Sequence, residues 1–158
     1  MALWDVRGKL CNQPLYKLLG GSSKPIPAYA GGIALGYLDE GAVQVFQPDL
    51  SKTGGITEAM RIAALVSAWG YKVHPHSSAT GINHAACVHY LAAVDNPGYF
   101  EACVSHYNPF RDMFGPGFQT DATGCVVPLE KPGLGLDVDE SVFEEFAFID
   151  GPGYVVKF

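Results

Sequence analysis

Apolar positions in the middle of the chain follow two spacings, one typical of buried strands and one typical of helices. Short apolar runs at 42–47, 71–73 and 99–102 predict three strands. Apolar residues at helical spacing within 56–69, and an alanine-rich stretch at 80–94, predict the two helices between them. Strand, helix, strand, helix, strand with short links is typical of consecutive parallel βα units. A Rossmann-like or flavodoxin-like sheet is also compatible with this pattern, although no GxGxxG motif is present.

The two ends of the chain differ from this middle region. Residues 2–19 place leucines on one helical face, and Pro14 predicts two helical pieces, because proline lacks an amide N–H and clashes with the preceding turn. A short strand is expected at 26–30. Residues 104–158 contain many glycines and prolines and show weak helical periodicity. Within them we expect one or two strands, one of them at 125–127, and a short acidic helix from 139 to 146.

Composition narrows the class of protein. The 158 residues are 48% hydrophobic and 16% charged, which is typical of a folded domain with a core. The net charge is −6, whereas nucleic-acid-binding proteins usually carry an excess of basic residues. The four cysteines form no CxxC pair and the chain begins without a secretory leader, so we expect reduced thiols and a cytoplasmic protein. No apolar stretch is long enough to span a bilayer.

Three polar side chains fall at the carboxyl ends of predicted strands, where the βα loops of a barrel converge on an active site. They are Asp49, His76 and Glu101. An aspartate beside a histidine fixes its tautomer, and such a histidine can take a proton from carbon. We therefore expect Asp49 and His76 within hydrogen-bonding reach. Taken singly, each residue has an ordinary structural alternative: a turn cap for Asp49, a loop histidine for His76, and a surface strand residue for Glu101.

Other histidines give weaker indications of a site. His84 and His89 are five residues apart, so on one helix they do not share a face as metal ligands at i and i+4 would. His74 and His76 would point to the same side of an extended strand, which could suit a zinc ion. No cysteine or carboxylate is close to them in sequence, so we favour the reading without metal.

Several segments, in order along the chain, resemble the mandelate racemase and muconate lactonizing enzyme family of the enolase superfamily. Residues 2–9 and 14–21 resemble the helix that leads into its barrel. Pro27-Ala28-Tyr29-Ala30 resembles its first barrel strand, and Gln47-Pro48-Asp49-Leu50 with Gly54-Gly55-Ile56 resembles its sixth strand and the following loop. Pro75-His76-Ser77 resembles the end of the seventh strand, and Tyr99-Phe100-Glu101 resembles the eighth. Pro132-Gly133-Leu134-Gly135 resembles its closing segment.

The resemblance implies a partial TIM-type (β/α) barrel with strands corresponding to 1, 6, 7 and 8. It divides the chain into a leading helical segment (1–24), the partial barrel (25–105) and a C-terminal tail that packs on it (106–158). It also implies a magnesium-dependent sugar-acid dehydratase or racemase, which abstracts the proton α to a carboxylate. In that family pattern, Asp49 and His76 form the acid–base dyad and Glu101 stabilises the enediolate.

The chain departs from the family between residues 30 and 41. Strands two to five, which carry the Lys-x-Lys motif and the metal-binding carboxylates of the family, have no counterpart in this sequence, so we expect no magnesium and little activity. Three hypotheses remain open: a shortened derivative without catalysis, an enzyme that recruits the missing groups from a partner chain, and a non-catalytic binding or assembly module. A partial barrel has open edges, which predicts a homo-oligomer. The substrate expected from the family is a small carboxylate or sugar acid.

Overall fold

Helices alternate with short strands through most of the chain in a computed structural model, which describes residues 2–30, 45–77 and 80–147. The helices are α1 (Ala2–Leu10), α2 (Leu15–Leu18), α3 (Ile56–Ala68), α4 (Gly81–Ala93), α5 (Pro109–Asp112) and α6 (Val142–Glu145). The strands are β1 (Ile26–Ala30), β2 (Val45–Phe46), β3 (Lys72–Val73), β4 (Phe100–Ala102), β5 (Phe118–Thr120) and β6 (Cys125–Pro128).

The helices and strands predicted from the hydrophobic pattern are confirmed in type and order. The break at Pro14 divides the leading helical segment into α1 and α2, as expected. The predicted strand at 42–47 is described only as β2, because residues 42–44 lie outside the described ranges. The tail has two strands, within the expected one or two, but the position of β5 was not predicted. The short helix α5 was not predicted either, since it has only four residues and lacks a periodic pattern.

The strands form an open sheet in two parts. Strand β1 pairs in parallel with β4, and β2 pairs in parallel with β3. A single parallel bridge between Val73 and Pro97 connects the two parts. On its other side β1 pairs antiparallel with β6, which forms a hairpin with β5. Within the described residues the strands do not close into a barrel.

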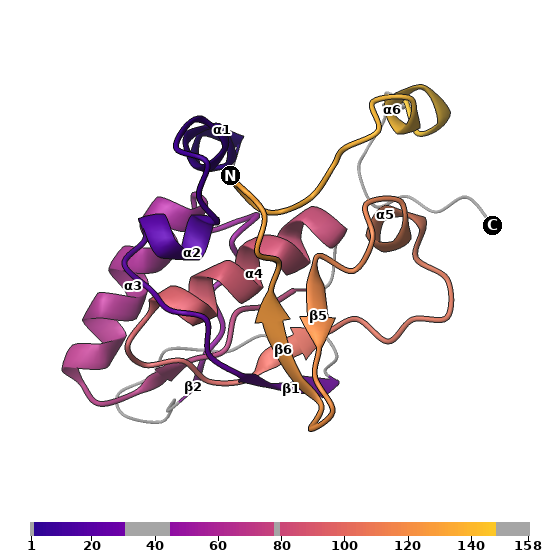
Figure 1. Cartoon of the computed structure of the whole chain (residues 1–158). Coiled ribbons are helices and arrows are strands. Elements are labelled where there is room, and N and C mark those ends of the chain that lie inside the picture. The colour runs from indigo at the N-terminus through magenta and orange to yellow at the C-terminus, as the bar shows by residue number, and fades with distance from the viewer. Residues whose placement is uncertain (1, 31–44, 78–79, 148–158) are drawn as a thin grey trace.

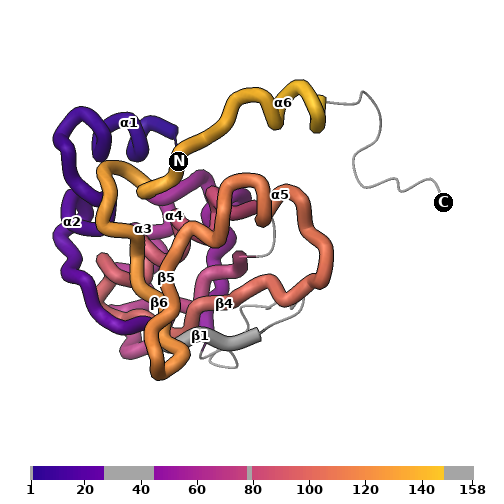
Figure 2. The backbone as a smooth tube through the Cα atoms, turned by 45° about the vertical axis from the view of Figure 1, so that its right-hand side comes forward, coloured from indigo at the N-terminus to yellow at the C-terminus, as the bar shows by residue number. Residues whose placement is uncertain are grey.

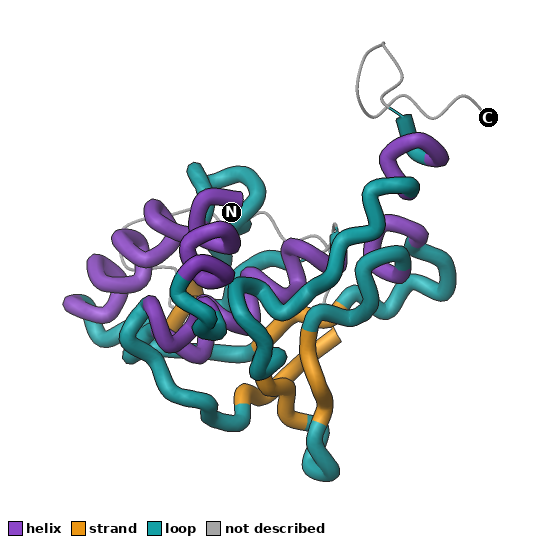
Figure 3. Tube along the Cα trace, turned by 45° about the horizontal axis from the view of Figure 1, so that its top comes forward, coloured by secondary structure: helices purple, strands orange, loops and turns teal. Residues whose placement is uncertain are grey.

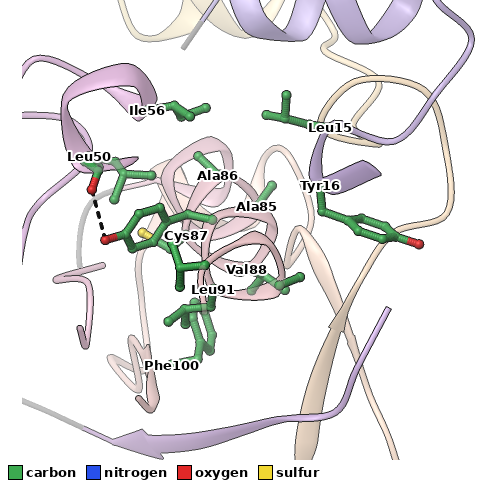
Figure 4. Close-up of a cluster of buried hydrophobic side chains, with 14 of the residues drawn as sticks. Leu15, Tyr16, Leu50, Ile56, Ala85, Ala86, Cys87, Val88, Leu91 and Phe100 are labelled. Carbon is green, nitrogen blue, oxygen red and sulfur yellow. Dashed lines mark hydrogen bonds between the residues drawn. The ribbon is translucent and has the colours of Figure 1, made fainter. Parts of the chain in front are cut away.

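Helix α4 lies against the sheet at the centre of the molecule (Figure 1). The larger helices gather beside the strands, as the colouring by secondary structure shows (Figure 3). Apolar side chains from α2, from the start of α3 and from β4 converge on α4 (Figure 4). Among them Leu15, Ile56, Leu91 and Phe100 are at most 1% exposed. Burial of apolar surface around this one helix therefore supplies most of the hydrophobic stabilisation.

Hydrogen bonds join α1 and α2 to residues 133–134 of the tail. The carboxylate of Asp5 in α1 accepts a hydrogen bond of 2.8 Å from the amide of Leu134. The amide of Leu15 donates to the carbonyl of Gly133 at 2.8 Å. A Cβ on Gly8 would lie 2.5 Å from the Cα of Gly133, so only glycine permits this approach. Beyond this junction the chain leaves the body, and α6 projects outward (Figures 1 and 2).

No described helix is long and apolar enough to cross a membrane.

Candidate active site

Asp49 lies three residues after β2, and its side chain is held in its own turn. One carboxylate oxygen accepts hydrogen bonds from the Ser51 amide at 2.8 Å and the Ser51 hydroxyl at 2.6 Å. The other forms an ion pair with Nζ of Lys52 at 2.9 Å. Burial raises the pKa of Asp49, but the hydrogen bonds from Lys52 and Ser51 outweigh it and hold that pKa below its ordinary value. Asp49 is therefore a fixed negative charge at neutral pH.

His76 occupies the equivalent position three residues after β3. Its backbone forms a parallel bridge with Asp49, and its amide donates to the carbonyl of Pro48 at 3.2 Å. The ring atom Nδ1 lies 2.7 Å from Oε2 of Glu101, and the His76 side chain is 17% exposed. A carboxylate accepts, so Nδ1–H donates in this pair. In the neutral ring this tautomer leaves the lone pair on Nε2, which is the form that a general base requires.

Glu101 lies in β4 and is 2% exposed. The oxygen that bonds with His76 also accepts a hydrogen bond of 3.0 Å from the amide of Ser77. Ser77 is in turn fixed through its carbonyl oxygen, which lies 2.7 Å from Nε2 of His84. Burial lowers the pKa of His84, so this ring is neutral and donates its Nε2–H to Ser77. The Glu101 carboxylate thus accepts hydrogen bonds from His76 and Ser77, and His84 in α4 holds Ser77 in place.

The structure brings all three predicted residues to the carboxyl ends of neighbouring strands but pairs them differently from our expectation. We expected His76 to bond with Asp49, and Nδ1 instead bonds with Glu101. The physical reason is local, because Ser51 and Lys52 already engage the Asp49 carboxylate. An aspartate followed by serine two residues later is a frequent turn motif. The sequence therefore already indicated that Ser51 could bind the Asp49 carboxylate in place of His76. The hydrogen bond from the Ser77 amide to Glu101 could not be predicted, because every residue except proline carries a backbone amide.

The described side chains do not fit a magnesium ion. Magnesium prefers several oxygen ligands in octahedral geometry. Across residues 2–30, 45–77 and 80–147, no group of three or more histidines, cysteines or carboxylates could hold a metal ion. The two carboxylates at the strand ends are engaged by Lys52 and His76. Nδ1 of His74, the other histidine considered for zinc, accepts a hydrogen bond of 2.9 Å from the Tyr99 amide.

Comparisons with known proteins connect this geometry to one superfamily. A 39% identical chain, a member of the enolase superfamily from Polaromonas sp. JS666, has a TM-score of 0.86 over 99% of this chain and 72% of its own. The mandelate racemase/muconate lactonizing enzyme from Sulfitobacter sp. is 27% identical, with a TM-score of 0.60 over 71% of this chain and 28% of its own.

Curated relatives agree with these structural neighbours. Arabinonate dehydratase of Saccharolobus solfataricus is 38% identical over 66% of this chain, and D-galactonate dehydratase of Xanthomonas oryzae pv. oryzae is 36% identical over 66%. The chain spans 28% of the length of each of these relatives. The family model for the enolase C-terminal domain-like family matches residues 34–142, more than half of the sequence. The chain therefore belongs to the enolase C-terminal domain-like family.

Proposed function

We propose that this chain carries the proton-transfer part of a sugar-acid dehydratase or racemase site. The observation that supports it is the hydrogen bond of 2.7 Å between Nδ1 of His76 and the buried carboxylate of Glu101. The names of the curated relatives, arabinonate and D-galactonate dehydratase, favour an acid sugar as the substrate class. In this proposal β1, β2, β3 and β4 correspond to barrel strands one, six, seven and eight.

Each strand-end side chain has a distinct role in this proposal. His76 transfers the proton at the carbon α to the substrate carboxylate through Nε2, while Glu101 holds the ring in the required tautomer. Departure of the β-hydroxyl as water, protonated by the His76 imidazolium, then yields an enol that tautomerises to a 2-oxo acid. Racemisation would need a second acid–base group on the opposite face of the substrate carbon. Asp49, whose carboxylate is paired with Lys52, holds His76 in place through the backbone bridge between the two residues.

We further propose that the isolated chain does not turn over sugar acids. The α-proton of a carboxylate is weakly acidic, and a histidine removes it only where the developing enediolate is stabilised by preorganised charge. In the described residues that charge is not assembled, since Lys52 is paired with Asp49 and no metal-binding group is present. The groups that complete such a site would have to come from outside the described residues, and family magnesium is not expected on these side chains.

An activity assay tests this proposal directly. Purified protein is incubated with arabinonate, galactonate and related sugar acids, with and without magnesium, and 2-oxo acid formation and α-proton exchange in deuterated water are followed by NMR. We expect neither reaction to exceed the rate of a His76→Asn control. Magnesium-dependent turnover that His76→Asn abolishes would overturn the inactivity while supporting the assignment of His76.

A second measurement tests the His76–Glu101 pair without requiring activity. Long-range ¹⁵N NMR correlations distinguish a histidine protonated on Nδ1 from one protonated on Nε2. We expect the Nδ1–H form in the wild-type protein and a shift toward Nε2–H in Glu101→Ala, because the acceptor for Nδ1–H has been removed. Asp121→Ala, at an exposed turn of the tail, serves as the matched carboxylate control. An unchanged tautomer in Glu101→Ala would contradict the proposal.

A further inference from the structure

A cavity lies near the amino ends of β1, β3 and β4, whereas His76 and Glu101 lie toward their carboxyl ends. Its volume is about 150 Å³, and its walls include Lys24 before β1, Lys72 at the start of β3, and Gly98 before β4. A cavity of about 10–15 Å³ already holds one water molecule, so this space admits a ligand of several heavy atoms. Neither the family resemblance nor the proposed proton transfer accounts for it.

The charge of this cavity is opposite to that of the chain. The whole protein carries a net charge of −6, yet the described lining residues include two lysines and no carboxylate. Nζ of Lys24 donates to the carbonyl of Val94 at 3.0 Å, which fixes its ammonium group in the wall. This bond uses one of three donors, so further donors remain on that nitrogen. Two ammonium groups on one small cavity favour an anionic occupant.

His74 also lines the cavity and is 8% exposed. Its Nδ1 accepts a hydrogen bond of 2.9 Å from the amide of Tyr99, so the neutral ring carries its proton on Nε2. Burial lowers the pKa of His74, and the nearby charge of Lys72 lowers it further. The ring lies where a Cβ on Gly98 would sit, 2.2 Å from Nε2, so glycine is required to seat it. A neutral imidazole, rather than a carboxylate, thus accompanies the two lysines in the lining.

We propose that this cavity binds a small oxyanion with the size and charge of inorganic phosphate, held by the ammonium groups of Lys24 and Lys72. Charge-assisted hydrogen bonds to a phosphate are stronger than neutral ones, and their partial enclosure reduces screening by salt. The site is at the other end of the sheet from the candidate active site, so its occupancy does not depend on catalysis.

Titration with inorganic phosphate tests the site by calorimetry and by ¹H–¹⁵N NMR. We expect saturable binding of one phosphate per chain, with shifts at the amides around His74 and Tyr99. Lys72→Met should weaken binding about tenfold, as expected for the loss of one charge-assisted contact. Lys24→Met should do the same, although it also removes the bond to Val94. Lys72 is exposed, so its variant is expected to fold normally.

The matched control is Lys131→Met, which removes an exposed lysine that pairs with Asp137. Unchanged phosphate binding in this variant, with competition by sulfate, supports an oxyanion site at Lys24 and Lys72. Binding that never saturates, or that Lys131→Met weakens as much as Lys72→Met, would show only the general attraction of lysines for anions and overturn the proposal. Binding that persists in a folded Lys24→Met/Lys72→Met protein would overturn it as well.

Discussion

Helices α3 and α4 are equal in length, with 13 residues each, but they differ in how much of their surface is covered. Eleven residues of α4 are buried, against four residues of α3. The reason is position, because α4 contacts β1, β4 and β6 on one side and α2 and α3 on others, whereas α3 packs mainly on β3 and α4. The comparison shows that, among the described residues, α2 and β6 complete the core around α4 and leave the outer face of α3 exposed.

Truncation of one leucine in each helix gives the largest expected contrast. Leu91 in α4 is fully buried, while Leu65 in α3 is 60% exposed. Leu91→Ala should lower the free energy of unfolding by about 2–5 kcal/mol, because it removes buried methyl groups and leaves a cavity. Leu65→Ala should change it by less than about 0.5 kcal/mol. Urea unfolding measures both, and equal losses would show that α3 is covered by something beyond the described contacts.

Histidine in the buried helix gives the second contrast, in the pH dependence of stability. His89 in α4 is fully buried, and its Nδ1 accepts a hydrogen bond from the Tyr16 amide at 3.1 Å. Burial lowers the pKa of His89 to about 4. The unfolded chain, with an ordinary value near 6.5, therefore takes up the proton first as the pH falls. The stability contributed by the neutral ring is complete above pH ~6.5 and decreases between pH ~6.5 and ~4, by roughly 3 kcal/mol at most.

Unfolding in urea at pH 7, 5.5 and 4.5 measures this decrease. His89→Gln removes the titrating ring but keeps an acceptor for the Tyr16 amide, so its stability should depend less on pH over this window. His106→Gln, at an exposed position in the tail, is the control and should retain the wild-type dependence. His74 and His84 remain in both variants, so the difference between the two curves isolates His89. Identical curves would contradict the assignment.

The sequence predicted the two long helices better than the contacts that surround them. The apolar run of α4 and the one-sided pattern of α3 are local features, so their type and bounds could be predicted. The antiparallel pairing of Ile26 with Val126 joins positions a hundred residues apart, and no local pattern indicates it. At the candidate site, strand order placed Asp49, His76 and Glu101 together. The choice of Glu101 as the partner of His76 depends on side-chain packing, which the sequence pattern does not specify.

The uncovered side of the molecule also gives a prediction about self-association. The amino-terminal part of β1 is paired with β6, so part of one expected open edge is covered by the tail. In the described residues β2 pairs only with β3, and Val45 in β2 is 46% exposed, with Trp69 after α3 at 66%. We expect a homo-oligomer that uses this edge, because an unpaired strand edge favours pairing with a second copy.

Substitution of a charge at this edge tests the prediction. Val45→Lys should weaken the association of copies by about tenfold or more, since a lysine on an edge strand opposes pairing. Leu3→Lys is the control, because Leu3 is 86% exposed on α1, away from β2 in sequence and contacts. Light scattering over a range of concentrations measures both variants. A wild-type protein that stays monomeric at high concentration would show that this edge is not used.

An ion pair on the exposed face of α3 gives the smallest expected effect. NH1 of Arg61 lies 3.0 Å from Oε2 of Glu58, and the two side chains are 74% and 46% exposed. Exposed pairs at this spacing stabilise a helix by only about 0.3–0.5 kcal/mol, since solvent screens the charges and two long side chains lose freedom. A double-mutant cycle with Glu58→Gln and Arg61→Gln should give a coupling energy in that range at low salt and nearly none at 1 M salt.

Glu58 also lies in the first turn of α3, where a negative charge interacts favourably with the helix dipole. Glu58→Gln should therefore cost more than Arg61→Gln by a few tenths of a kcal/mol. A coupling above about 1 kcal/mol that persists at high salt would mean that the pair is shielded from solvent, and that the outer face of α3 is covered in solution as α4 is in the core.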